Sequence, residues 1–374
     1  MNMPAQVANS SAVKIREVQL SEYPHIEALL RRNGLYTKKR EEWEHLWVNN
    51  PVYKKLQQWA VGWAVEDSQQ EIVGYIGNLP VSASFRGREF IASCMNSLVA
   101  DPSYRGYAGY LLRRAINYKL PDLTIASTAN GDAVHLLDGF RLSHIPAGDW
   151  GQASFWITHY SGFAGSVFAQ KGWSRPLSTS AATILWLKDH LSRRNSWIQK
   201  HLEKFEVSPA FDERFDVFWH ELKHVYPERL LLTRSREVLD WHFRFAVQDQ
   251  RLWIVTCSDN SRMMAYALFR RRDVPEYGLK RMQFIDFQTL NGDNDVLVAM
   301  VAWALKKCQE EGIHTLEAFG FHPRKQSVID GLKPYHRKLP SWWYFYKAVN
   351  KDLGRELQNP DLWDPSHFDG DASL

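Results

Sequence analysis

The chain has 374 residues, of which 45% are hydrophobic and 24% charged, which excludes a disordered or fibrous protein and predicts a globular one with about two domains. Its formal net charge is only +4 and its basic runs are short and far apart, so we expect no nucleic-acid partner. The 3 cysteines lack the spacing of a disulfide framework or a zinc site, and no apolar run approaches the roughly 20 residues of a membrane span, so we expect a cytoplasmic protein with no metal and no transmembrane segment.

The region before position 100 predicts one helix among several short strands. A strand is expected at 14–18 and a helix at 22–32, where apolar residues recur at helical spacing until Gly34 ends the pattern. Strands at 59–65 and 72–80 meet at a polar turn, and strands at 81–85 and 90–93 meet at a turn around Gly87. This order indicates a sheet built as a meander.

The junction between a strand and a helix at 97–112 is the most informative segment. Arg105 and Gly106 lie where the apolar strand turns into the helix. Main-chain N–H groups in the first turn of a helix have no partner within it, and the helix dipole attracts negative charge there. The segment therefore predicts a site for a pyrophosphate. The alternative is an ordinary strand–turn–helix with an exposed arginine.

A helix at 109–119, a strand at 123–127 and a short helix at 132–138 follow this junction, and Gly139-Phe140 closes the unit. The order of elements and the two junctions resemble the GNAT family of acyltransferases. Arg105-Gly106 matches the start of the family's acyl-CoA loop, whereas Ala108 and Tyr110 stand where its small residues are expected.

The resemblance implies an α/β (α+β) fold and a set of residues that bind an acyl-CoA. Main-chain N–H groups at Leu98 and Val99 are expected to meet the thioester carbonyl and the pantetheine, and Asn130 is expected to help hold the cofactor. His135 takes the place of a family tyrosine that protonates the departing thiolate. The pyrophosphate is expected on the N–H groups of Arg105, Gly106, Tyr107, Ala108, Gly109 and Tyr110.

A long amphipathic segment between about 160 and 210 predicts a connecting helix. Its basic residues, among them Lys188 and Arg193, are compatible with an anionic membrane surface, and also with a helix that packs against two domains, which is the reading we adopt.

From about 230 the chain repeats the pattern of its first half, with a Trp-containing helix at 236–243, a meander at 252–266, a strand at 281–288 and a helix at 293–309. A strand at 315–321 and a short helix at 324–332 complete the repeat, unless the likeness is a coincidence. Its loop lacks the arginine and carries Asp293 where a pyrophosphate would sit, so like charges would repel. We therefore expect the second unit to be structural or to bind the acceptor.

The expected architecture is a pair of tandem GNAT-like units, each a mixed, mostly antiparallel twisted sheet flanked by helices. It resembles the large two-unit GNAT proteins associated with polysaccharide synthesis. The expected divisions are a catalytic, acyl-CoA-binding unit at 14–160, a helical connector at 161–229, a degenerate unit at 230–350 and a C-terminal tail at 351–374.

The resemblance implies an N-acyltransferase that uses acetyl-CoA or a longer acyl-CoA and an amine acceptor on a sugar, a peptide or a small molecule. Two alternatives stay open: a catalytically silent protein that binds an acyl-CoA or a partner, and an aminoacyltransferase that takes its donor from charged tRNA. A covalent route through Cys94 has no histidine or aspartate at a diagnostic spacing to support it. The sequence leaves the oligomeric state open.

Overall fold

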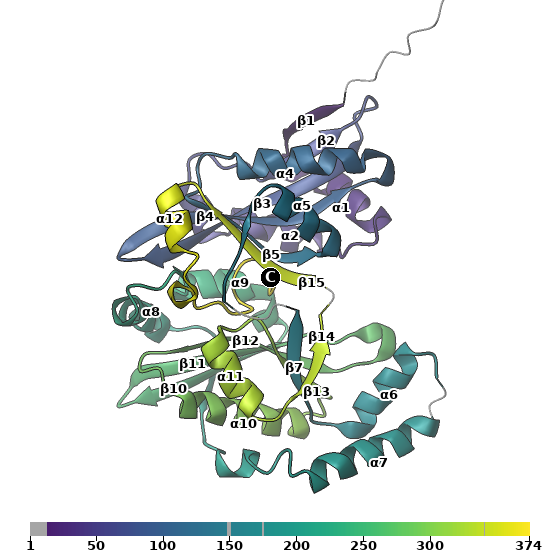
Figure 1. Ribbon diagram of the computed structural model, residues 1–374, viewed down its shortest axis with the longest axis vertical. Coiled ribbons are helices and arrows are strands. Elements are labelled where there is room, and N and C mark those ends of the chain that lie inside the picture. Colours follow the sequence, from purple (N-terminus) through teal and green to yellow (C-terminus); the bar gives the residue numbers. More distant parts are fainter. Residues whose placement is uncertain (1–12, 148–150, 174–175, 340) are drawn as a thin grey trace, which may run out of the picture.

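Two twisted β-sheets lie one above the other, with helices between them and on both outer faces (Figure 1). The computed structural model describes residues 13–147, 151–173, 176–339 and 341–374, and it leaves the side chains of residues 130, 176, 341 and 342 undescribed.

The first sheet contains most of the strands of the expected acyl-CoA-binding unit. Its strand order is β1-β2-β3-β4-β5-β15-β6, with β9 paired to β3, and every pair is antiparallel except β4 with β5. The strands are β1 (Lys14–Glu17), β2 (Gly62–Glu66), β3 (Ile72–Phe85), β4 (Arg88–Ala100), β5 (Leu123–Asn130), β6 (Ser143–His144), β9 (Leu231–Leu232) and β15 (Ser341–Ala348).

The second sheet has the same character, with strand order β14-β7-β13-β12-β11-β10-β8 and a single parallel pair, β12 with β13, among its described strands. The strands are β7 (Gln152–Ile157), β8 (Glu206–Ser208), β10 (Leu252–Asp259), β11 (Arg262–Arg271), β12 (Arg281–Thr289), β13 (Thr315–Ala318) and β14 (Tyr335–Lys338). Two mixed, mostly antiparallel sheets confirm the predicted fold class.

Each half of the chain contributes strands to the sheet of the other half. Strand β7, near the end of the expected first unit, pairs with β13 and β14 of the second sheet, whereas β9 and β15 from the second half pair with strands of the first sheet. The expected division at residue 160 therefore does not coincide with the division between the sheets, because β7 precedes residue 160 in the chain but belongs to the second sheet.

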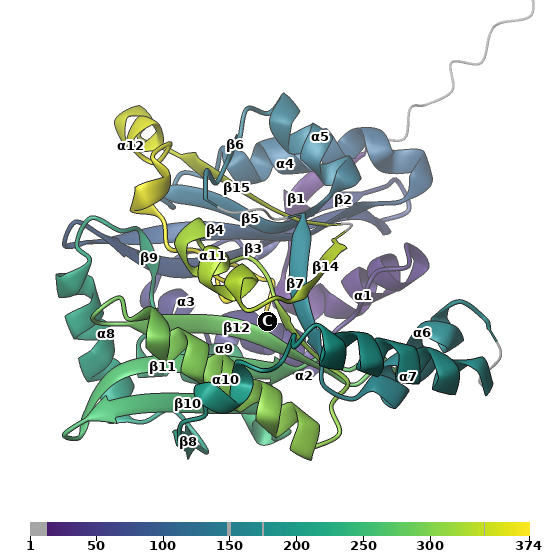
Figure 2. The same cartoon turned by 60° about the horizontal axis from the view of Figure 1, so that its bottom comes forward.

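The helices form three layers around the sheets, as Figure 2 shows. Helices α4 and α5 cover the outer face of the first sheet, α10 and α11 cover the outer face of the second, and a central layer fills the space between the sheets. The outer helices are α4 (Ala108–Ile116), α5 (Gly131–Gly139), α10 (Asn294–Glu310) and α11 (Pro323–Gly331). The central helices are α1 (Tyr23–Arg32), α2 (Arg40–Val48), α3 (Pro51–Lys55), α8 (Glu213–Val225) and α9 (Arg236–Gln248).

Helix α12 (Lys351–Glu356) packs on β15, and short 3₁₀ turns connect several elements. These turns are η1 (Leu20–Glu22), η2 (Pro102–Tyr107), η3 (Ile198–Lys200), η4 (Pro275–Tyr277) and η5 (Pro360–Leu362).

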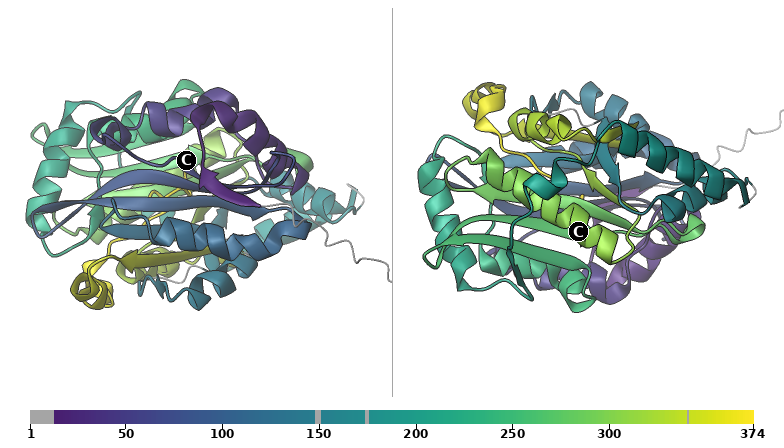
Figure 3. Two further views of the ribbon diagram at one scale, coloured as in Figure 1. Left: turned by 90° about the horizontal axis from the view of Figure 1, so that it is seen from above. Right: turned by 90° about the horizontal axis from the view of Figure 1, so that it is seen from below.

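Helices α6 (Tyr160–Gln170) and α7 (Pro176–Leu191) form a hairpin that projects from one end of the molecule (Figure 3). We expected this segment to pack between two units, and that expectation is wrong for α7. Most of its large apolar side chains are exposed instead: Leu177, Ile184, Trp186, Leu187 and Leu191.

The strands expected at 72–80 and 81–85 form one continuous strand, β3, which passes through Pro80. Main-chain groups of Asn78 and Ser82 point away from β4, since the N–H of Asn78 donates to Val61 and the carbonyl of Ser82 accepts from Thr233. Because main-chain groups alternate along a strand, the main-chain nitrogen of Pro80 faces the same side as those of Asn78 and Ser82. On that side Pro80 lies after the last residue of β3 that pairs with β2 and before the first residue that pairs with β9. Its missing N–H therefore costs no ladder hydrogen bond.

The segment after η5 runs through the middle of the molecule, where Figure 1 marks the C-terminus between the two sheets. Trp363 and Phe368 belong to the central core, and Asp369 lies beside the buried Arg234. The expected tail at 351–374 is therefore a helix followed by a buried segment that touches both sheets.

Candidate active site

The parallel strands β4 and β5 pair over only part of their length. Their pairing joins Ala92 with Leu123, Ser93 with Thr124 and Cys94 with Ile125, and stops there. Beyond this point the two strands separate, so the edge of β4 from 95 to 100 has no strand partner on that side among the described residues. A gap between strands exposes main-chain donors that a ligand can use.

Strand β4 also carries a bulge where the two strands separate. Tyr75 pairs with Val99 and Gly77 pairs with Asn96, so two residues of β4, Ser97 and Leu98, oppose one residue of β3. Ser97 adopts φ 52°, which is a strained value for a residue other than glycine. Bulges of this kind redirect main-chain groups and are common beside active sites.

A cavity of about 420 Å³ passes through the first sheet at this gap. On the outer side it is bounded by Leu112 of α4 and Leu137 of α5, and on the inner side by Trp43 and Leu46 of α2. Tyr23 of α1 stacks on Trp43, with ring centroids 4.7 Å apart. The cavity therefore joins the two faces of the sheet through a largely apolar passage.

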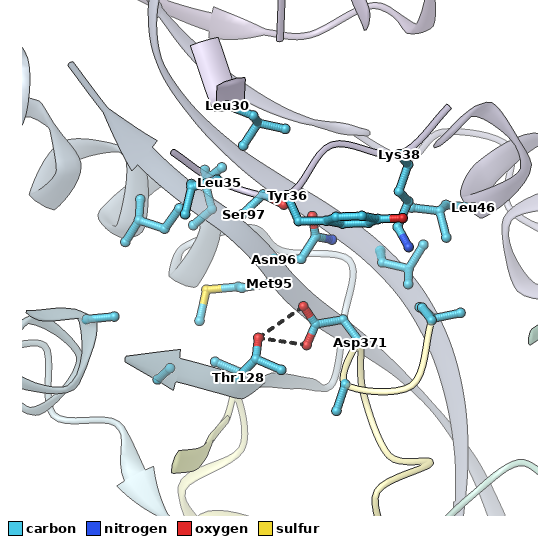
Figure 4. A pocket seen from close by; sticks show the side chains of 18 of the residues that line it. Leu30, Leu35, Tyr36, Lys38, Leu46, Met95, Asn96, Ser97, Thr128 and Asp371 are labelled. Atoms are coloured by element: carbon cyan, nitrogen blue, oxygen red, sulfur yellow. Dashed lines mark hydrogen bonds between the residues drawn. The ribbon is translucent and has the colours of Figure 1, made fainter. Parts of the chain in front are cut away.

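Polar side chains from several elements also line this cavity, and Figure 4 shows those of Lys38, Asn96, Ser97, Thr128 and Asp371. They come from β4, from β5, from the segment between α1 and α2, from the end of β11 and from the C-terminal segment. The polar lining residues are Asn96, Ser97, Thr128, Lys38, Arg272 and Asp371.

Asp371 is the one acidic side chain that lines the cavity in the described part of the chain. Its carboxylate accepts hydrogen bonds from the hydroxyl of Ser127 at 2.7 Å and from that of Thr128 at 3.1 and 3.2 Å. Burial raises the pKa of Asp371 above its ordinary value, and the two hydroxyl groups oppose that rise. A carboxylate with a raised pKa at the end of an apolar passage is suited to accept a proton.

The predicted pyrophosphate loop is the 3₁₀ turn η2, which leads directly into α4. Arg105 and Gly106 are exposed, and none of the residues from Arg105 to Tyr110 lines the cavity. The amide of Ala108 donates to the carbonyl of Arg105, so that amide already has a partner. The Tyr110 ring is 60% exposed, so it does not obstruct the passage.

The remaining predicted residues are distributed unevenly around the cavity. Leu98 lines it, and Val99 is paired with Tyr75 on the other edge of β4. Asn130 ends β5, and its side chain lies outside the described residues. His135 is exposed, because on α5 it lies on the face opposite Ala133 and Leu137, which line the cavity.

Sequence reasoning missed Lys38, Arg272 and Asp371. They lie in three segments more than 90 residues apart, so no spacing in the chain relates them. The basic runs at 38–40 and 270–272 contain two of these residues, and we interpret such runs in a sequence as solvent-facing charge, whereas Lys38 and Arg272 line the cavity.

No group of three metal-binding side chains lies close together within the described ranges, and no helix there is long and apolar enough to cross a membrane.

Solved structures share this architecture across nearly the whole chain. N-myristoyltransferase from Saccharomyces cerevisiae with bound myristoyl-CoA is similar over 93% of this chain and 81% of its own, with a TM-score of 0.58 and 12% identity. The chain has the two-unit GNAT fold.

Two further structures agree with this fold. A GCN5-related N-acetyltransferase from Kribbella flavida matches 92% of this chain and 73% of its own, with a TM-score of 0.55 and 10% identity. A probable N-acyltransferase from Enterococcus faecalis matches 91% of this chain and 73% of its own, with a TM-score of 0.53 and 8% identity. These structures confirm the predicted resemblance in fold. No protein-family model and no curated protein sequence matches the chain.

Proposed function

We propose that this protein is an N-acyltransferase, which moves an acyl group from an acyl-CoA to an amine at the cavity of the first unit. The observation that carries the proposal is the passage through the sheet where β4 and β5 separate. A donor held on the α4 and α5 side and an acceptor on the α1 and α2 side would meet at that opening. Bringing two reactants together in this way supplies much of the catalysis of acyl transfer.

The donor would place its pyrophosphate at the start of α4 and its thioester at the bulge. Arg105 is exposed at the first of these places, and Leu98 lines the cavity at the second. A main-chain N–H directed at the thioester carbonyl would stabilise the negative charge that develops on its oxygen.

The proposed reaction needs one proton acceptor and one proton donor. The amine nitrogen bonds to the thioester carbon, the carbon–sulfur bond breaks, and the amine proton passes to the carboxylate of Asp371 directly or through a water. The departing thiolate takes up a proton from solvent or from an acid. His135 stays a prediction for that acid, although its exposed position gives it no contact with the cavity.

A long acyl chain suits the cavity better than an acetyl group does. The lining is mostly leucine, isoleucine, alanine and aromatic side chains, and each buried methylene contributes about 0.8 kcal/mol. The yeast N-myristoyltransferase of similar fold was solved with bound myristoyl-CoA. We propose a donor with a chain of this kind.

The first test measures release of the free thiol of CoA from acetyl-, octanoyl- and tetradecanoyl-CoA in the presence of amines. We expect kcat/KM to be highest for one of the two long donors. The Asp371→Asn variant is expected to lose about 10²–10⁴-fold in kcat, because it keeps the shape and loses the base. Binding of donor without turnover over a broad panel of amino acids, peptides, amino sugars and polyamines would contradict the proposal and favour the silent alternative.

The second test concerns the donor loop. Arg105→Glu is expected to raise the KM for the donor strongly, because it places negative charge beside the pyrophosphate. Arg114→Glu, an equal change of charge further along α4, is the matched control and should leave that KM unchanged. An equal rise in the donor KM for the two substitutions would contradict the proposal that Arg105 contacts the donor.

A further inference from the structure

Three basic side chains lie near one another on the inner side of the first sheet, and two of them, Lys38 and Arg272, reach the cavity. Lys38 comes from the segment between α1 and α2, and Arg270 and Arg272 come from the end of β11 and the residue just after it. Because side chains alternate along a strand, Arg270 and Arg272 share a face, whereas Arg271 points to the other face and pairs with Asp273 at 3.0 Å. Lys38 and Arg272 both line the cavity.

These three side chains have no ionic partner among the described residues. Nη1 of Arg270 is buried without any hydrogen bond, and the side chain of Arg272 donates only to the carbonyl of Ala372, at 3.3 Å. The contrast with Arg234 is direct, since that buried guanidinium pairs with Asp286 at 2.8 Å and with Asp369 at 3.1 Å. Lys38, Arg270 and Arg272 are half-buried, and cations held partly away from water without an ionic partner are uncommon in a folded protein.

The surroundings add little negative charge. Glu42 and Asp371 are the carboxylates that face the cluster, and the hydroxyl of Tyr36 lies nearby. Arg251 and Arg281 add positive charge, although Arg281 also lies 3.5 Å from Glu317. Burial and the neighbouring guanidinium groups together lower the pKa of Lys38 to about 8 and that of Arg270 to about 9.

Lys38, Arg270 and Arg272 carry more positive charge than the carboxylates of Glu42 and Asp371 can balance, so the cluster favours an anionic ligand. A carboxylate supplies negative charge, and its two oxygens match the planar fork of a guanidinium.

The position of the cluster assigns the ligand to the acceptor. The cluster lies on the side of the sheet covered by α1 and α2, across the sheet from α4, where the donor pyrophosphate is expected. We infer that Lys38, Arg270 and Arg272 form a carboxylate-binding subsite, so that the acceptor is an amine that also carries a carboxylate, such as a free amino acid or a short peptide. The assignment of this ligand as the acceptor rests on the proposed function, whereas the subsite itself can be tested by binding alone.

The binding test uses two ligands that differ only in charge, N-dodecanoylglycine and its primary amide. Calorimetry on the full chain should show that the wild-type protein binds the carboxylate about 10–100-fold more tightly than the amide, as expected for hydrogen bonds to a charged group. The Lys38→Gln/Arg272→Gln double variant should reduce that ratio to about twofold or less. Lys39→Gln, a change at the exposed neighbouring lysine, is the matched control and should keep the wild-type ratio.

Two results would overturn the inference. One is an equal affinity of the wild-type protein for carboxylate and amide, or a preference that survives in the double variant. The other is a loss of affinity for CoA itself in the double variant as large as the loss for N-dodecanoylglycine, because the cluster would then belong to a phosphate of the donor. If the double variant does not fold, Lys38→Met and Arg272→Lys as single variants must each lower the ratio.

An activity test separates this inference from the proposed function. Transfer to glycine and to glycinamide is compared in the wild-type protein, with a lower KM expected for glycine. Equal KM values for both amines would refute the subsite and leave the acyltransferase proposal standing. A charge preference in binding without transfer to any amine would keep the subsite and refute the acyltransferase proposal.

Discussion

The two sheets contain the same gap between parallel strands, but only the first gap is open. In the second sheet, β12 and β13 pair from Arg281 with Thr315 to Phe284 with Ala318 and then separate. Residues 364–369 of the C-terminal segment fill that space. The hydroxyl of Ser366 donates to the carboxylate of Asp286 at 2.7 Å, and the ring centroids of His367 and Phe319 lie 4.2 Å apart. The first gap is lined by apolar side chains around a cavity of about 420 Å³.

The comparison shows how one fold can serve as a site in one unit and as a support in the other. The filled gap is held by a buried network of charged groups around Arg234 and Asp286, whereas the open gap leaves Lys38, Arg270 and Arg272 without ionic partners. The same C-terminal segment continues from the filled gap to the open one, where Asp371 binds Ser127 and Thr128. Packing of the second unit therefore positions a carboxylate in the first.

The largest effect is expected when the network in the filled gap is broken. Arg234→Met leaves the buried carboxylates of Asp286 and Asp369 without their cation, so we expect a loss of about 3–5 kcal/mol in the free energy of unfolding. Chemical denaturation measures it. Arg324→Met, which removes the exposed pair with Asp361, is the control and should cost less than about 1 kcal/mol. Equal losses in the two variants would mean that the filled gap is not a structural support.

A smaller loss is expected from Gly370→Ala, at the point where the segment passes from one gap to the other. Gly370 has φ +81°, and a Cβ atom there would collide with the hydroxyl of Ser127. We expect a cost of about 2 kcal/mol or more and a fall in kcat, since Asp371 is displaced. Gly354→Ala, where an added Cβ meets only Ala348 at 3.6 Å, should have little effect on either quantity. An unchanged kcat in the Gly370→Ala variant would contradict the proposed role of Asp371 as the proton acceptor.

A third test compares the two gaps directly by adding bulk to each. Ala129 lines the open cavity, and Ala318 is fully buried at the filled gap. Ala129→Leu is expected to leave stability unchanged or raise it by up to about 1 kcal/mol while weakening binding of the longest acyl donors. Ala318→Leu is expected to destabilise by about 1–3 kcal/mol, because no space receives the added atoms. Equal destabilisation by both would argue that the first gap closes in solution.

Much of this fold can be predicted from local patterns in the sequence. The helix at 22–32 and the strand-to-helix junction near Arg105 lie where they were expected, and so does the repeat in the second half. Each depends on hydrophobic period and turn residues within one short segment, which the chain displays directly. The carboxylate of Asp293, expected to repel a pyrophosphate, caps α10 by accepting from the amide of Asp295 at 2.8 Å.

The site could be predicted only in part, because its polar groups come from distant segments. Lys38, Arg272 and Asp371 meet only after the two sheets are stacked and the C-terminal segment is threaded between them. The strand bulge at Ser97 has no glycine to mark it. The exposure of His135 was within reach of sequence reasoning, since Ala133 and Leu137 at helical spacing place the apolar face of α5 on its other side.

The last prediction concerns the pH dependence of stability and arises from the unpaired cation in the open gap. Folding lowers the pKa of Lys38 to about 8, while an unfolded lysine titrates near about 10.4, so the folded state binds fewer protons between these values. Stability of the wild-type protein should therefore rise relative to Lys38→Met as pH increases from 8 to 10, so the advantage of the variant should be full below pH 8 and should shrink towards pH 10. Denaturation at pH 7 and pH 10 measures this difference, with Lys39→Met as control. Saturating N-dodecanoylglycine should remove it, because a bound carboxylate raises the pKa of Lys38 again, whereas a difference that persists in the presence of ligand would place the anion elsewhere.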